Sequence, residues 1–135
     1  MTEPLAFEAL LPEPYDQALT RVADALQAQG FGILTRIDVR QTFKEKLGQD
    51  FRPYAILGAC NPELAHRALS ARADIGLLLP CTVTVESAGA DQTLVRVGNP
   101  GAMMGLGGLA DDPAIQPIAA EARRRIEAVA AALAS

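Results

Sequence analysis

The sequence has few of the residues on which several classes of protein depend. Its 135 residues include two cysteines, one histidine and no tryptophan. Two cysteines are too few for the disulfide framework of a small secreted domain, and no C-x-x-C pair of the zinc-finger kind is present. The single histidine could pair with Cys60 as base and nucleophile, but the spacing offers no third residue to orient the base, so no catalytic triad is assembled from the sequence.

Long apolar runs and an excess of positive charge are also missing. No stretch approaches the roughly 18 apolar residues that a membrane span needs, and the first residues lack the basic region of a signal peptide. The net charge is −4 and the pI about 4.9, whereas nucleic-acid binders carry a basic stripe. We therefore expect a cytoplasmic protein, with both cysteines as thiols and with neither membrane nor nucleic acid as partner.

What is present is an ordinary globular composition. Half of the residues are hydrophobic and a fifth are charged, so the chain can bury a core of its own. No repeat, low-complexity tract or linker divides it. The sequence predicts a single domain over residues 1–135.

Helical and strand periodicities alternate along the chain. The predicted strands cover about 5–11, 31–39, 52–60, 75–87 with a bend at Pro80, and 92–99, and the predicted helices cover 15–29, 38–47, 62–72 and about 113 onward. The last two strands are close enough to form a hairpin. These elements predict an α+β fold with two layers, in which helices pack on a mostly antiparallel sheet.

Local signals define several of these elements more closely. Asp38 is expected to cap the second helix, and Asn61, followed by a proline, to cap the third. Asn61 is also a candidate ligand-binding residue. In the second strand, Phe31, Ile33 and Ile37 are predicted to share one face.

The segments "YAILGACNPELAHRAL" and "IGLLLPCTVTV" resemble the family known as domain of unknown function 302. The similarity extends from "GFGILTRIDV" through "FKEKLGQDFRPY" to Pro100 and Met103, and so covers most of the chain. The sequence differs from the family pattern at Thr82, where asparagine is usual. The resemblance implies a compact α+β fold and a homodimer, and it implies no particular activity.

One candidate site is a cluster of basic residues in "RQTFKEKLGQDFRPY". Lys44, Lys46 and Arg52 concentrate positive charge in an acidic protein, and Asp50 can order the group. Such a cluster is typical of a pocket for a carboxylate or phosphate. The alternative is a solvated helix face with ordinary ion pairs.

A second candidate site involves the two thiols. Cys60 precedes a helix N-terminus, where a thiolate is favoured, and Cys81 follows a proline on another predicted strand. If adjacent, they would form a redox pair, or would bind a soft metal together with His66 and Met103 or Met104. The alternative is that both are small buried hydrophobic residues.

The sequence therefore favours a homodimer that binds a small ligand, most simply an anion, with no cofactor and no assigned catalysis. The competing hypotheses are a thiol-dependent redox or sulfur-handling protein, with Cys60 and Cys81 as the candidate catalytic residues, and a protein that binds a soft metal.

Overall fold

A computed structural model describes residues 3–135. Its elements, in chain order, are β1 (Ala6–Leu11), α1 (Tyr15–Ala28), β2 (Gly32–Asp38), α2 (Val39–Leu47), β3 (Tyr54–Cys60), α3 (Pro62–Ala71), the 3-10 helix η1 (Ala73–Leu78), β4 (Cys81–Gly89), β5 (Gln92–Gly98), α4 (Pro100–Met103), the 3-10 helix η2 (Leu106–Asp111) and α5 (Gln116–Ala134). Among residues 3–135, none of the helices combines the length and the hydropathy that crossing a bilayer requires.

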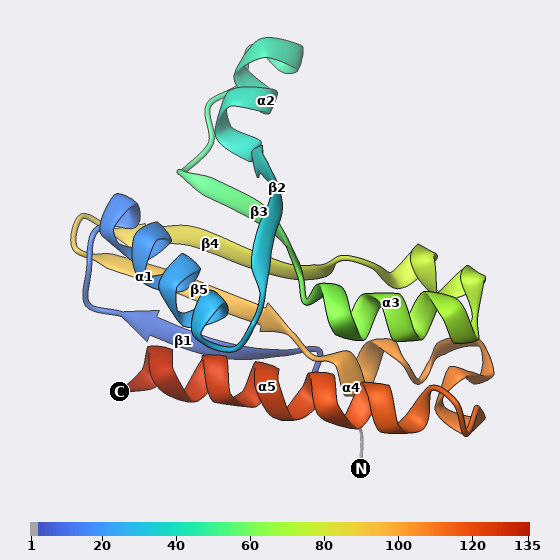
Figure 1. The fold of residues 1–135 in the computed structure, drawn as a ribbon. Helices are drawn as coiled ribbons and strands as arrows, with labels where there is room; N and C mark the ends of the chain where they lie inside the picture. Colours follow the sequence, from blue (N-terminus) through green and yellow to red (C-terminus); the bar gives the residue numbers. More distant parts are fainter. Residues whose placement is uncertain (1–2) are drawn as a thin grey trace.

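The strands form a single antiparallel sheet in the order β1-β5-β4-β3-β2. Helices α1 and α5 lie side by side on one face of this sheet (Figure 1). The prediction of an α+β fold with helices on a mostly antiparallel sheet is confirmed. The predicted hairpin between β4 and β5 is also present.

The main core lies between these two layers. Alternate residues of the strands point toward the helices, because successive side chains of a strand leave its opposite faces. The fully buried members include Leu57, Val83, Val85, Val95 and Val97 from the sheet, and Val22, Leu26, Ile126 and Val129 from the helices. Burying each such side chain contributes about 1.5–3 kcal/mol, so this interface holds α1 and α5 in place.

A second, smaller core closes one end of the sheet. It joins α3, η1, η2 and the beginning of α5 through buried residues that include Leu64, Ile75, Leu109 and Ile118. Figure 1 shows α3 beside the N-terminal part of α5, beyond the ends of the strands. The chain turns from β3 into α3 at this point.

The predicted helix caps are confirmed. Asp38 Oδ1 accepts a hydrogen bond from the backbone N–H of Gln41 at 3.0 Å, and Asn61 Oδ1 accepts one from Leu64 at 3.1 Å. Each bond satisfies an N–H group that has no partner within its helix. The last helix begins at Gln116, slightly later than expected.

One predicted strand is partly wrong. Residues 75–79 were expected to begin the strand that continues through Pro80, but Ala73–Leu78 forms η1 and β4 starts at Cys81. A short apolar run does not by itself distinguish a strand from a buried helical turn. Here Ile75 is buried in the second core while Leu77 is exposed, as a tight helix requires.

The predicted face of β2 is also wrong at one residue. Ile33 is paired with Ala59, which points into the core, whereas Ile37 is paired with Ile56, which points to the opposite face. A β-bulge between Ile33 and Thr35 causes the difference, because one extra residue reverses the alternation beyond it.

The part of the chain around α2 projects away from the two layers (Figure 1). We call residues 37–53 the arm. None of the residues of α2 is buried, and the Phe43 ring packs edge to face on Phe51, with the ring centres 5.2 Å apart. The arm is therefore stabilised mainly by contacts within itself and by its connections to β2 and β3.

Candidate functional site

The face of the sheet opposite α1 and α5, which we call the open face, carries charged and hydroxyl side chains. Directly paired residues of antiparallel strands share a face. The pairs Tyr54–Glu86 and Thr84–Arg96 therefore lie together on three neighbouring strands, and Glu8 of β1 is paired with Arg96. These polar residues alternate in sequence with the core valines of β4 and β5.

Glu86 is the centre of an ion-pair network on the open face. Arg52 Nε donates to Glu86 Oε2 at 2.6 Å, and Arg96 Nη1 donates to Glu86 Oε1. Arg96 Nε also donates to Glu8 Oε2 at 2.9 Å. The Glu86 side chain is 7% exposed, whereas those of Arg52 and Arg96 are 51% and 36% exposed. The network thus joins a buried carboxylate to two guanidinium groups that reach solvent.

These contacts decide the protonation of Glu86. Burial acts to raise the pKa of its carboxyl group, but the hydrogen bonds and charges of Arg96 and Arg52 outweigh burial and hold the pKa below its usual value. Glu86 is therefore ionised at neutral pH and keeps both arginines oriented.

A hollow of about 440 Å³ lies over this network. It is lined by Leu5, Ala6, Arg52, Tyr54, Thr82, Thr84, Glu86, Arg96, Gly98 and Met103. The guanidinium of Arg52 lies 4.5 Å from the ring centre of Phe51 and 5.8 Å from that of Tyr54. At these distances the guanidinium makes cation–π contacts with both rings.

Several donors in the hollow have no acceptor within residues 3–135. Of the two arginines that line it, Arg52 has Nη1 and Nη2 and Arg96 has Nη2 without such an acceptor. Thr84 Oγ1 is fully buried and, across the part of the chain that the structure describes, makes no hydrogen bond. A buried hydroxyl without a partner is uncommon in proteins and calls for an explanation.

The structure brings together only part of the predicted basic cluster. Lys44 Nζ lies 3.4 Å from Asp50 Oδ1, but both side chains are largely exposed, so solvent screens the pair. Lys46 is exposed on α2. Arg52 turns toward Glu86 on the open face, and the buried Asn61 lies near α3. Near Lys44 there is a hollow of about 420 Å³, which acidic side chains line together with basic ones.

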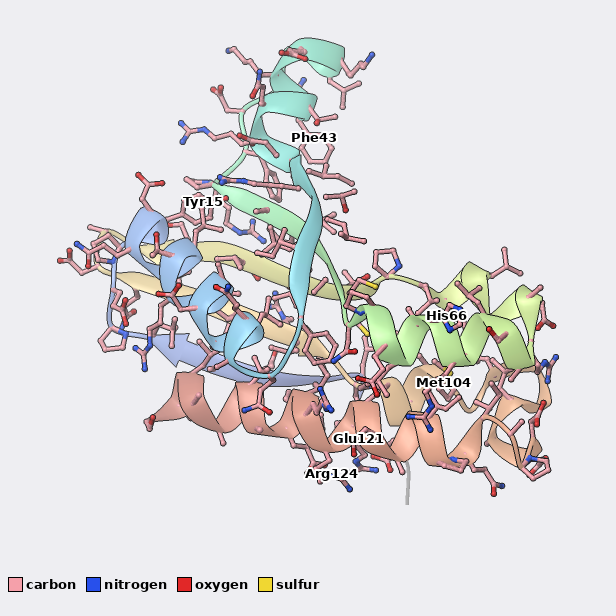
Figure 2. All side chains as sticks on the ribbon, in the orientation of Figure 1. Tyr15, Phe43, His66, Met104, Glu121 and Arg124 are labelled. Atoms are coloured by element: carbon pink, nitrogen blue, oxygen red, sulfur yellow. The ribbon has the colours of Figure 1, made fainter. Side chains whose placement is uncertain are left out.

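The two cysteines approach one cavity between the ends of β3 and β4 and the helices α3 and α5. This cavity, of about 40 Å³, is lined by both cysteines, by Asn61 and Met104, and otherwise by apolar residues. Figure 2 labels His66 on α3 and Met104 below it. His66 is exposed, and Met103 lines the hollow on the open face instead.

Burial, and to a smaller extent the charge of Cys60, raises the pKa of the Cys81 thiol to about 11. Cys81 is thus protonated at neutral pH and is not an activated nucleophile. Within residues 3–135, no three His, Cys, Asp or Glu side chains group in a way that would hold a metal ion.

The sequence analysis missed Thr84, Glu86 and Arg96. All three alternate with apolar residues in predicted strands. Polar residues in such an alternation indicate that one face of the sheet is not covered by helices. The pairing of Glu86 with arginines from two other segments depends on strand register, which this signal does not contain.

Fold and site together define a class: small two-layer α+β proteins whose single antiparallel sheet keeps a polar open face. Residues 7–133 match the family described as "Domain of unknown function DUF302", and the chain belongs to this family. The crystal structure of an "uncharacterized conserved protein DUF302 from Bacillus stearothermophilus" is similar, with 28% sequence identity and a TM-score of 0.82 over 96% of this chain and 98% of that chain. None of the curated proteins matches the chain.

Proposed function

We propose that the protein binds a small anionic ligand in the hollow on the open face. The observation that carries the proposal is the buried, unpaired hydroxyl of Thr84 beside two guanidinium groups with free N–H donors. Donors without acceptors favour an oxyanion, because a carboxylate or phosphate supplies only acceptors. The proposed anion site therefore lies on the sheet and not at the lysines of α2, and of the predicted basic residues it includes only Arg52.

The shape of the hollow favours a carboxylate with a short apolar chain. Its volume of about 440 Å³ lies within the roughly 300–1,000 Å³ that is usual for small-molecule sites. Leu5, Ala6 and Met103 add apolar side chains to its lining. Because Arg52 is half exposed, its side chain can move to admit a carboxylate to the Thr84 hydroxyl. The proposal covers binding and no chemical step.

Calorimetric titration with hexanoate tests the proposal, with hexylammonium as a probe of the same chain length and opposite charge. Hexanoate should bind and hexylammonium should not. Thr84→Val and Arg52→Gln should each weaken hexanoate binding about tenfold or more, since a hydrogen bond to a charged group contributes roughly 1.5–3 kcal/mol. The control Lys46→Gln should leave binding unchanged. Equal binding of both probes, or unchanged binding in both site variants, would refute the site.

The homodimer remains part of the proposal, and the exposed edge of β2 supports it. All seven residues of β2 are exposed, among them Ile33, Leu34 and Ile37. A long apolar edge strand is normally protected, because its free backbone groups pair readily with another strand. Antiparallel pairing of two β2 strands would join these free backbone groups to those of a second copy of the chain.

Sedimentation equilibrium measures this directly. The protein should be a dimer at micromolar concentration, and Leu34→Lys should shift it to a monomer. Leu77→Lys is the matched control, because Leu77 is even more exposed, at 89%, but lies on η1. A monomeric wild-type protein, or a Leu34→Lys variant that stays dimeric, would contradict the proposal.

A further inference from the structure

Two cavities continue the hollow of the open face around the end of the sheet. The first, which we call the middle cavity, has a volume of about 50 Å³ and meets the hollow at residues that line both: Thr82, Gly98 and Met103. The second is the cavity of about 40 Å³ already described between the sheet and helices α3 and α5, which we call the inner cavity. It meets the middle cavity at three further shared residues: Cys81, Pro100 and Met104. The three spaces are therefore neighbours, in the order hollow, middle cavity, inner cavity.

Charge is confined to one end of this series. Arg52, Glu86 and Arg96 line the hollow, whereas among the described residues no charged side chain lines the middle or the inner cavity. The inner cavity is formed by apolar side chains apart from Asn61 and the two cysteines. Apolar cavities in proteins stay dry and take up apolar molecules. A ligand that suits both ends of the series therefore has one anionic group and an apolar tail.

We propose that the ligand of the open face is a medium-chain fatty acid whose tail enters these cavities. The inference rests on the anion site proposed above, with the carboxylate at Thr84 and the two arginines and the tail running past Met103 and Met104. Both methionines are half-buried, and a methionine side chain is unbranched and adapts to irregular space. The two side chains can therefore move aside and join the hollow to the cavities.

The spacing of residues along β4 sets the length of chain that the hollow holds. Thr82 and Thr84 both line the hollow and lie two residues apart in the strand, a separation of about 7 Å. An extended alkyl chain of about six bonds covers the same distance, because each residue of a strand adds three backbone bonds. Hexanoate therefore ends near Thr82, and the carbons of a longer chain extend into the middle cavity.

The volumes of the two cavities limit the chain further. A site for one water molecule needs about 10–15 Å³, and a methylene group is similar in size to a water molecule. The middle cavity of about 50 Å³ and the inner cavity of about 40 Å³ thus each hold about three or four chain carbons. We expect decanoate to fill the middle cavity and dodecanoate to reach the inner one.

Calorimetric titration with hexanoate, decanoate and dodecanoate tests the inference, with decylammonium as the control for unspecific binding of an apolar chain. Burial of one methylene group favours binding by up to about fourfold, so decanoate should bind at least about tenfold more tightly than hexanoate. Dodecanoate should bind more tightly again, and decylammonium should bind much more weakly than decanoate. Equal affinities for hexanoate and decanoate, or for decanoate and decylammonium, would overturn the inference.

Filling the inner cavity tests where the end of the chain lies. Ala119 lines this cavity, whereas the next residue of α5, Ala120, is exposed. Ala119→Leu should remove the advantage of dodecanoate over decanoate and leave hexanoate binding unchanged. The matched control Ala120→Leu should leave all three affinities unchanged. Dodecanoate affinities that are the same in the two variants would contradict a tail in the inner cavity.

NMR of the wild-type protein with dodecanoate gives a readout that needs no variant. The terminal methyl group of the ligand should show nuclear Overhauser effects to Ile118 and Met104, which line the inner cavity. Effects only to residues of the hollow, such as Leu5, would overturn the inference. Hexanoate binding without any gain for longer chains refutes the path of the tail and leaves the anion site standing. Absence of binding by all three carboxylates refutes the anion site, and this inference with it.

Discussion

Replacing Glu86 by glutamine should destabilise the fold, because this residue holds two arginines on the open face. The amide is nearly isosteric but removes the negative charge and one of the two acceptors that Arg52 and Arg96 use. A hydrogen bond to a charged group is worth about 1.5–3 kcal/mol. Since both arginines reach solvent, hydrogen bonds to water replace part of the lost stabilisation. We expect a loss of about 1–3 kcal/mol at pH 7, or a fall in Tm of roughly 3–11 °C.

The pH dependence of this effect gives the sharper test. The pKa of Glu86 is lower in the folded protein than its ordinary value of about 4.3. The carboxylate therefore stabilises the fold at pH values above 4.3, and this stabilisation is lost as the pH falls through the folded-state pKa. The difference in stability between wild type and Glu86→Gln should be greatest above about pH 5 and should shrink toward pH 3.

Thermal unfolding followed by circular dichroism between pH 3 and pH 7 measures both effects. Glu127→Gln is the control, because Glu127 is 49% exposed and pairs with Arg123 on the surface of α5. Such a pair contributes about 0.3–0.5 kcal/mol. The reasoning is refuted if Glu86→Gln is as stable as the wild type at pH 7, or if the difference between them does not change with pH.

Three further predictions concern the thiol, the sheet and the core. Cys81, with a pKa of about 11, should be alkylated by iodoacetamide about tenfold faster for each unit of pH from 7 to 10, and peptide mapping that shows a plateau near pH 8 would contradict this. Gly58→Ala should destabilise the protein by about 1–3 kcal/mol in urea unfolding, because a Cβ there would lie 2.4 Å from the Thr35 hydroxyl and 2.7 Å from the Pro80 ring. Gly32→Ala is the control and should be neutral, because a Cβ there has no described atom within 4 Å. Leu26→Ala should cost about 2–5 kcal/mol, while Leu77→Ala, exposed on η1, should change stability by less than about 0.5 kcal/mol in the same assay.

The features that the sequence predicted correctly are those determined by neighbours along the chain. The caps at Asp38 and Asn61 depend on an oxygen and an N–H group three residues apart. The last helix, expected from about residue 113 onward, is present as α5, and its helical periodicity puts the buried Ile126 and Val129 on one face. Local geometry is enough to predict such features.

The errors have the opposite origin. Ile75 lies in an apolar run that either a strand or a tight helix can bury, and only the second core decides between them. Ile37 changes face because of a bulge whose position depends on how β2 pairs with β3. An apolar pattern contains neither piece of information.

In the candidate site, too, contacts between sequence neighbours were predicted and contacts between distant residues were not. Lys44 and Asp50 are close in sequence, and the structure places them together. Arg52 is close to both, yet its guanidinium binds Glu86, which is distant in sequence and reaches Arg52 through the pairing of β3 with β4. A charge cluster found along the chain therefore did not reveal the partner of Arg52, while the role of the two lysines stays a prediction. Charged residues inside an apolar strand alternation, such as Glu86 and Arg96, indicate an uncovered face of the sheet, because only such a face accepts them without burying an unpaired charge.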